Sequence, residues 1–256
     1  KSSYKLRKGD EINIFNINLQ PRIDKKKINY YKASKKDLSS SKGMFIEDNE
    51  NFAIINKPAG ISVQPGTKSR KNLIDILRYT KEFAETKPFV VHRIDKETTG
   101  LLIVAKNRNY AQLFTSLFRI RKIYKTYLGI VLGNLGKSSG TYTDFLYNYE
   151  GDKKIKSKAI THFKVLDSNN NYSLLKLNPT TGRKHQLRKQ LLIHGHPILG
   201  DTKYRLVEKN HNKKDTLMLH AFKIDFSINN QRYNFIADLP ESFKKNLREK
   251  YLKISL

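Results

Sequence analysis

The residues with the clearest capacity for chemistry lie in one polar stretch between two apolar runs, residues 92–100 (HRIDKETTG). Within it Asp95 has a cation close on either side, Arg93 and Lys96. A cation within reach keeps a carboxylate ionised because it lowers the carboxyl pKa. An ionised aspartate in a cleft can act as a nucleophile or as a general base. The alternative is a surface loop in which Asp95 only pairs with Arg93, and the spacing by itself leaves both interpretations open.

Two other polar motifs do not complete a recognised site. The segment 133–139 (GNLGKSS) contains a Gly-Lys-Ser run, but a phosphate-binding P-loop needs another glycine where Val131 stands. We therefore interpret Gly136-Lys137 as a hairpin turn. Three histidines gather around one predicted helix: His185, His194 and His196. Since no cysteine or carboxylate completes a zinc spacing, we interpret them as structural or RNA-facing and predict no metal site.

The charge balance favours a polyanionic partner. The 256 residues include 50 Lys+Arg against 23 Asp+Glu, which gives a formal charge of +27. Cations that neutralise phosphates release counterions, so nucleic acid is the favoured partner. One alternative is a solvated basic surface whose lysines reflect genomic base composition. Another is an anionic membrane, although no long basic amphipathic helix supports it.

The chain contains no cysteine, which excludes disulfides, cysteine nucleophiles, iron–sulfur clusters and Cys-ligated zinc. This fits a reducing compartment, and we expect a cytoplasmic protein. The mean hydropathy is −0.63, and no run approaches the ~20 apolar residues of a transmembrane helix. We therefore expect no membrane association.

The elements around the Asp95 loop alternate between many short strands and a few helices. Helices are predicted at 72–83 behind an Asn72 cap, 109–118, 184–195 closed by Gly195, and 241–253. Strands are predicted within 44–60 (a hairpin), 88–95, 101–106, 125–133, 141–149, 158–167 and 172–179, with a second hairpin across Asn229-Asn230. Because short turns join many strands, we predict an α+β fold with a mostly antiparallel sheet.

The front of the chain differs in composition from the rest. Residues 11–19 alternate loosely and predict a strand. Residues 21–42 are basic, contain several serines and have few aliphatic side chains, which predicts a linker or surface arm. A single compact domain is predicted from 43 to 256.

Four motifs in order carry a resemblance to a known family. Residues 92–106 (HRIDKETTGLLIVAK) closely resemble the HRLDxxTSGLLLxAK signature of the RluA/RluC/RluD family of RNA pseudouridine synthases. The other similar stretches are 57–63 (KPAGISV), 125–133 (KTY with Val131 and Gly133), and 181–188 with 195–201 (TGRKHQLR and GHPILGD). The match covers roughly residues 44–240. The chain departs from the family pattern at Lys189-Gln190, where Val-His is usual.

The resemblance implies a pseudouridine synthase fold for residues 43–256, with flanking helices and a catalytic cleft. It also implies a reaction that cuts the uridine N1–C1′ bond, turns the base and joins C5 to C1′ without cofactor or metal. By matching position, Asp95 is the catalytic carboxylate and Tyr127 stacks on the flipped base. Arg188 pairs with the carboxylate, and a bidentate guanidinium would orient Asp95 and keep it ionised. Arg93 is expected to help flip the base or hold the RNA backbone.

Basic residues of the same motifs are expected to contact RNA: His92, Lys57, Lys125, Arg183, Lys184 and His185. Residues 1–20, through the stretch 5–12 (KLRKGDEI), resemble the tail of an S4-type RNA-binding domain whose remainder is missing. Together with the stretch 60–67 (GISVQPGT), this remnant looks most like the RluC branch, so we expect action on large-subunit ribosomal RNA. We also expect a monomer. The alternatives are an RluD-type or tRNA-specific synthase, or a catalytically idle RNA-binding or ribosome-assembly factor.

Overall fold

The computed structural model describes residues 7–11, 30–65, 71–150, 153–206 and 216–254. The chain divides into two units, Lys1–Tyr30 and Tyr31–Leu256, and only the second is described at length. The predicted strand at 11–19 and most of the predicted S4-like tail at 1–20 lie outside the described residues.

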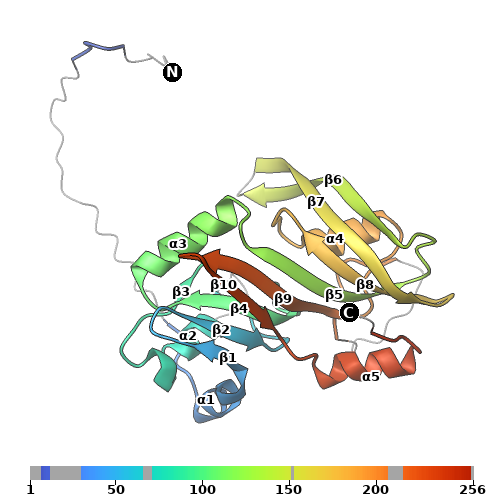
Figure 1. Cartoon of the computed structure of the whole chain (residues 1–256), viewed down its shortest axis with the longest axis horizontal. Helices are drawn as coiled ribbons and strands as arrows, with labels where there is room; N and C mark the ends of the chain where they lie inside the picture. Colours follow the sequence, from blue (N-terminus) through green and yellow to red (C-terminus); the bar gives the residue numbers. More distant parts are fainter. Residues whose placement is uncertain (1–6, 12–29, 66–70, 151–152, 207–215, 255–256) are drawn as a thin grey trace. The chain divides into compact units, whose positions relative to one another are not determined.

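One large sheet runs through the second unit (Figure 1). Its strands are β1 (Phe45–Asp48), β2 (Phe52–Lys57), β3 (Phe89–Val90), β4 (Thr99–Ala105), β5 (Tyr124–Leu132), β6 (Ser139–Glu150), β7 (Lys153–Ser168), β8 (Tyr172–Pro179), β9 (Leu219–Ile228) and β10 (Gln231–Ile236). The order is β1-β2-β4-β9-β5-β8-β7-β6, with β3 paired to β4 and β10 to β9. Among the described strands every pairing is antiparallel except that of β4 with β9. The predicted α+β fold with a mostly antiparallel sheet is confirmed.

Two of the helices begin at asparagine caps, of which the sequence predicted Asn72. Asn72 and Asn107 accept the backbone N–H groups at the starts of α2 (Leu73–Leu77) and α3 (Arg108–Arg119). The helices α4 (Gln186–Ile193) and α5 (Glu241–Glu249) also lie within their predicted ranges. None of the helices in the described ranges is long and apolar enough to cross a bilayer.

The predicted helix at 72–83 is too long. Thr80 has an extended backbone, and its hydroxyl donates to the carbonyl of Leu77 at 3.0 Å. This side-chain bond competes with helix continuation, so α2 ends and a 3-10 turn (Lys81–Phe83) follows.

The predicted linker is wrong for residues 31–42. This stretch belongs to the second unit, and α1 (Lys35–Ser41) begins at a capping box between Ser34 and Asp37. The backbone N–H of Tyr31 donates to Asp75 of α2 at 2.7 Å, and Lys71 pairs with Asp37. The few aliphatic side chains concealed this helix, because polar contacts hold much of it in place. A second 3-10 turn (Lys42–Met44) leads into β1.

Strand β4 is buried on both faces and anchors the loop that precedes it. Leu102 and Val104 pack in one cluster with residues of α2, while Leu101 and Ile103 pack in another with Phe114 of α3. Successive side chains of a strand point to opposite faces, so an unbroken apolar run is what two-sided burial requires.

Gly100 allows β4 and β9 to meet. It lies beside Ala221 in the parallel pairing and has a φ of 103°. A Cβ at this position would collide with the backbone of Ala221, and the positive φ also favours glycine. The Asp95 loop is therefore held at the seam between the β1-β2-β4 side and the β9-β5-β8-β7-β6 side of the sheet.

Candidate active site

A cleft of about 610 Å³ opens at this seam. It is lined by the loop 91–95, Arg119 at the end of α3, Arg121 just after it, the start of β5, and residues 179–188. Every predicted site residue except Lys57 lines it: His92, Arg93, Asp95, Lys125, Tyr127, Arg183, Lys184, His185 and Arg188. Tertiary structure thus gathers three separate sequence motifs around one cavity.

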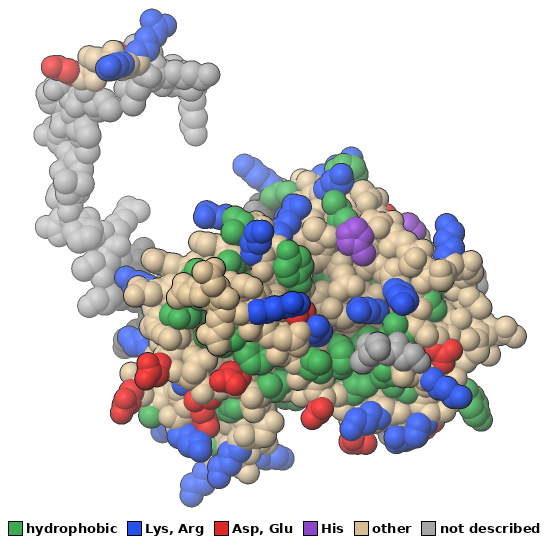
Figure 2. Space-filling model, viewed as in Figure 1, with side chains coloured by type: hydrophobic (Ala, Val, Ile, Leu, Met, Phe, Trp, Pro, Cys, Tyr) green, Lys and Arg blue, Asp and Glu red, His purple; other side chains and the backbone are tan. Residues whose placement is uncertain are grey.

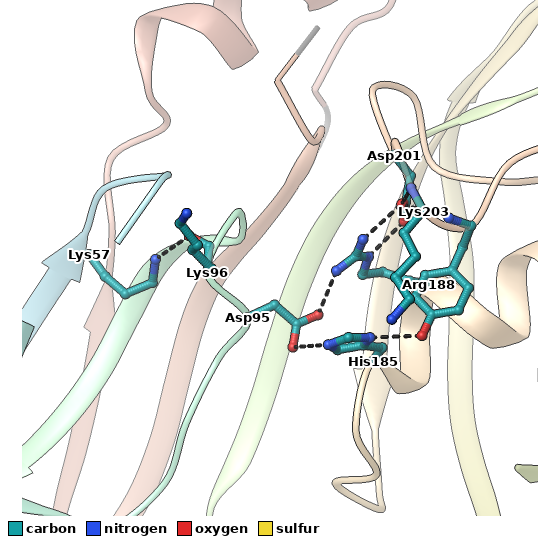
Figure 3. Close-up of polar contacts among 8 residues, drawn as sticks. Lys57, Asp95, Lys96, His185, Arg188, Asp201 and Lys203 are labelled. Atoms are coloured by element: carbon teal, nitrogen blue, oxygen red, sulfur yellow. Dashed lines mark hydrogen bonds and ion pairs between the residues drawn. The ribbon is translucent and has the colours of Figure 1, made fainter. Parts of the chain in front are cut away.

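Backbone contacts hold the Asp95 loop in shape. The N–H of Thr98 donates to the carbonyl of Asp95 at 3.2 Å, which closes a tight turn. The carbonyl of Lys96 accepts from the N–H of Gly60 and from Lys57 Nζ, both at 3.0 Å. These bonds leave the Asp95 carboxylate directed toward Arg188 and His185 (Figure 3).

Lys57 supports the loop from below and cannot reach RNA, so its predicted RNA contact is wrong. Its exposed fraction is 0%, and its Nζ donates to the carbonyls of Pro58, Ile61 and Lys96 at 2.7, 3.0 and 3.0 Å. Burial lowers the pKa of Lys57 to about 7, although the charges of Glu97 and Asp95 oppose that change. Lys57 therefore has a structural role, which is to hold three backbone carbonyls in place.

Arg188 is buried between two carboxylates. Its Nε and Nη2 donate to Asp201 at 2.7 and 2.8 Å, while Nη1 donates to Asp95 Oδ2 at 3.2 Å. Burial opposes its charge, yet the hydrogen bond and charge of Asp201, with Asp95, raise the pKa of Arg188 above its ordinary value. The expected bidentate contact with Asp95 is wrong: the two-pronged contact is made with Asp201, and Asp95 receives one N–H.

Asp201 is a site residue that the sequence reasoning did not assign. Burial opposes its ionisation, but hydrogen bonds from Arg188 and from the backbone N–H groups of Tyr204 and Lys203 lower the pKa of Asp201. The only sequence signal was its place at the end of GHPILGD, next to the Arg188 segment.

His185 touches the other oxygen of Asp95. It has a left-handed backbone (φ 55°) just before α4, which turns its ring into the cleft. Its Nε2 lies 3.7 Å from Asp95 Oδ1, and its Nδ1 lies 2.8 Å from the hydroxyl of Tyr204. Burial lowers the pKa of His185 to about 4, so the ring is neutral at neutral pH. Tyr204 is a second residue that sequence reasoning missed.

Tyr127 faces the same cavity from β5. The register of β5 against β9 shifts between Thr126 and Tyr127, and such an irregularity re-aims a side chain. Burial and the charge of Asp95 raise the pKa of Tyr127, so its phenol keeps its proton. A carboxylate, a fixed cation and a planar ring therefore meet in one cleft.

Comparison with known families matches residues 51–192 to the family described as RNA pseudouridylate synthase. The chain belongs to that family. The resemblance inferred from the sequence motifs is thereby confirmed.

Two curated relatives share much of this family member's sequence. Ribosomal large subunit pseudouridine synthase D of Borreliella burgdorferi is 35% identical over 214 residues, which are 77% of this chain and 65% of that protein. Ribosomal large subunit pseudouridine synthase C of Rickettsia conorii is 36% identical over 210 residues, 77% of this chain and 68% of that protein. The chain therefore spans about two thirds of the length of these relatives.

Solved structures share the fold. Human RNA Pseudouridylate Synthase Domain Containing 4 superposes with a TM-score of 0.75 at 24% identity, covering 86% of this chain and 98% of that one. Human RNA Pseudouridylate Synthase Domain Containing 1 gives a TM-score of 0.65 at 25% identity, covering 77% and 83%. The predicted pseudouridine synthase fold is confirmed.

The remaining basic residues lie either in the wall of the cleft or at its rim. His92 is a neutral part of the wall: burial lowers its pKa to about 3, and its Nε2 accepts the N–H of Ile103 at 2.8 Å. It carries no cation for a phosphate, which corrects its expected role as a basic contact. Burial also lowers the pKa of Lys125. Arg93, Arg183 and Lys184 are exposed and form a cationic rim.

The departure at Lys189-Gln190 serves packing outside the cleft. Gln190 is fully buried, accepts from Thr161 Oγ1 at 2.7 Å and donates to Asp144 at 2.7 Å. Lys189 Nζ donates to the carbonyl of Tyr147 at 2.8 Å. Both residues fasten α4 to the ribbon of β6 and β7 and leave Arg188 free to face Asp95.

The other two histidines of the predicted group have separate partners. His194 Nε2 lies 3.2 Å from Asp144, and His196 Nδ1 donates to the carbonyl of Leu132 at 3.0 Å. Within the described parts of the chain, no three His, Cys, Asp or Glu side chains are grouped as metal ligands.

Proposed function

We propose that this family member converts specific uridines of large-subunit ribosomal RNA to pseudouridine. The observation that carries the proposal is the Asp95 carboxylate, which lies in a cation-rimmed cleft beside the buried Arg188 and together with Tyr127. The names of the Borreliella and Rickettsia relatives support the ribosomal substrate.

The proposed reaction rearranges bonds within one nucleotide. The N1–C1′ bond breaks, the base turns, and C5 bonds to C1′ as C5 gives up its proton and N1 gains one. Because product and substrate are isomers, the reaction balances without a redox partner or group donor. Asp95 either adds through its carboxylate oxygen to C1′ or removes a ribose proton to give a glycal. Both routes need its ionised form.

Arg188 and Tyr127 complete the proposed pocket. Arg188 holds one oxygen of Asp95 and is itself fixed by Asp201, so the carboxylate is held in one orientation. The Tyr127 ring would stack on the flipped uracil, an interaction worth about 1–3 kcal/mol.

The target uridine must leave the RNA stack to reach this pocket. Flipping costs a few kcal/mol of unstacking. In the proposed complex, phosphate contacts from Arg93, Arg183 and Lys184 on the rim offset part of that cost.

The direct test is tritium release from large-subunit ribosomal RNA labelled at C5 of uridine. We expect release with the native chain and none with Asp95→Asn. Mapping of the modified positions separates an RluC-type from an RluD-type enzyme, the second being favoured by the name of the Borreliella relative. Turnover on transfer RNA alone would contradict the ribosomal substrate, and RNA binding without release would favour an idle binding factor.

We also propose that the enzyme works as a monomer in the cytoplasm. A single chain suffices to bring Asp95, Tyr127 and Arg188 into one cleft, and the proposed substrate is a ribosomal RNA. Light scattering should then give a mass near 29.8 kDa, and a dimer mass would contradict the monomer.

A further inference from the structure

The ribbon of β6 and β7 carries a row of aromatic and cationic side chains that the proposed chemistry does not use. On β6, alternate residues Phe145, Tyr147 and Tyr149 are 56%, 48% and 71% exposed. Residues two apart in a strand share a face, so the three rings form one row. Their cross-strand partners on β7 are lysines, and we name the whole set the aromatic–lysine ladder: Phe145, Tyr147, Tyr149, Lys154, Lys156 and Lys158.

Two of the three lysines of the ladder lie over its rings. Lys154 Nζ lies 4.4 Å from the centre of the Tyr147 ring, and Lys156 Nζ lies 4.5 Å from the centre of the Phe145 ring. Both distances are within the range of a cation–π contact. The ladder therefore presents ring surfaces and ammonium groups in a fixed alternation.

The opposite face of the ribbon is the one that packs on the protein. Tyr142, Leu146 and Ala159 are buried, and Asp144 accepts from Gln190 of α4. The ladder faces away from this contact, and its residues stay exposed. Figure 2 shows hydrophobic and Lys or Arg side chains next to one another over the region where Figure 1 draws β6 and β7. Exposed apolar rows of this kind usually mark an interaction site.

The ladder begins at the rim of the cleft. Arg183 lines the cleft, and its Nε donates to the carbonyl of Lys158 at 3.1 Å. Lys158 pairs with Phe145, the first ring of the row. From Lys158 to Lys154 the strand extends roughly 13 Å away from that point. A polymer held in the cleft can therefore continue along the ladder.

We propose that the aromatic–lysine ladder binds a single-stranded RNA segment that flanks the target uridine. The inference rests on the proposed function, since it takes RNA as the occupant of the cleft. Rings stack on unpaired bases, and lysines between them neutralise the phosphates that join those bases. A duplex hides its base faces and could use only the lysines, so the rings select single strands.

The test is binding of the native chain to two fluorescent probes, a short single-stranded oligouridine and a duplex RNA of equal length. We expect Tyr149→Ala to weaken binding of the single strand about tenfold and to leave duplex binding unchanged. Tyr149→Phe, which keeps the ring, should bind both probes like the native chain. Tyr149 is the most exposed ring of the ladder, so its removal disturbs packing least.

Two further variants complete the experiment. Tyr251→Ala removes a ring that is 88% exposed beyond α5, and it should change neither affinity. Lys154→Gln with Lys156→Gln should flatten the dependence of log K on log salt for the single strand. If Tyr149→Ala weakened binding of both probes equally, or weakened neither, the proposed role of the ladder would be overturned. Absence of tritium release by the native chain would instead overturn the proposed function, because binding to these probes is measured without turnover.

Discussion

Two buried cations support the Asp95 loop region, and their surroundings are opposite in kind. Lys57 donates to three backbone carbonyls, whereas Arg188 donates to the carboxylates of Asp201 and Asp95. Burial lowers the pKa of Lys57 to about 7, while burial of Arg188 is outweighed by its carboxylate partners, which raise its pKa. Lys57 can lose its charge and still donate hydrogen bonds to the loop. Arg188 supplies a permanent charge beside the Asp95 carboxylate.

The largest effect is expected from removing the carboxylate of Asp95, to which Arg188 donates. Asp95→Asn should abolish pseudouridine formation, because an amide is neither nucleophile nor base. The free energy of unfolding should hardly change, since Arg188 keeps its two-pronged contact with Asp201. Tritium release and urea unfolding measure the two quantities. Retained turnover would remove Asp95 from the mechanism.

The second prediction compares the two cations directly. Arg188→Met should lower the free energy of unfolding by ~3–5 kcal/mol, because buried Asp201 loses its counter-charge. Lys57→Met should cost only ~1–3 kcal/mol, because the groups left unpaired are neutral carbonyls. Urea unfolding curves of both variants give the difference.

A paired substitution is the control for that comparison. Arg188→Met combined with Asp201→Leu removes both charges and should recover most of the lost stability. If the double variant were as unstable as Arg188→Met, packing rather than charge would explain the loss.

The third prediction is that Lys57, unlike Arg188, makes the free energy of unfolding depend on pH. The pKa of Lys57 is about 7 in the folded chain against 10.5 ordinarily, so between these values the unfolded chain binds more protons. The free energy of unfolding therefore rises with pH, by about 2 kcal/mol from pH 7 to pH 9. Lys57→Met should lack this rise, whereas the raised pKa of Arg188 keeps it charged throughout. Parallel stability curves for native and Lys57→Met chains would contradict the prediction.

The smallest effect is expected at Tyr204, which contacts His185. Tyr204→Phe removes the hydroxyl that lies 2.8 Å from His185 Nδ1, a hydrogen bond worth ~0.5–1.5 kcal/mol. We expect kcat to fall by less than about tenfold with little change in KM, because the His185 ring orients Asp95 more than it binds RNA. Tyr251→Phe, a change far out on the surface, should leave both constants unchanged. A loss as large as that of Asp95→Asn would make Tyr204 part of the chemistry.

The local pieces of this molecule could be predicted from the sequence because each depends on a few neighbouring residues. The caps Asn72 and Asn107 begin helices through bonds three residues away. Asn229 and Asn230 both adopt positive φ, as a two-residue hairpin turn requires. The family motifs also indicated that Asp95, Tyr127 and Arg188 share a cleft.

The polar partners could not be predicted in the same way. Lys57 looked like one more surface cation of a basic chain. Distant segments of the chain bury it, and there it holds backbone carbonyls in place. Residues 31–42 looked like a linker because their contacts, such as Tyr31 with Asp75, cross 44 positions.

What the sequence by itself determined is therefore most of the secondary-structure elements and the family, and its motifs led to the proposal of Asp95 as the reacting carboxylate. Tertiary structure alone decided that Asp201 rather than Asp95 receives both prongs of Arg188, and that His185 reaches Asp95 while bonded to Tyr204. The physical reason is that backbone conformation follows local sterics and hydrogen bonds. Burial and charge pairing instead depend on which remote segments the folded chain brings within a few ångströms.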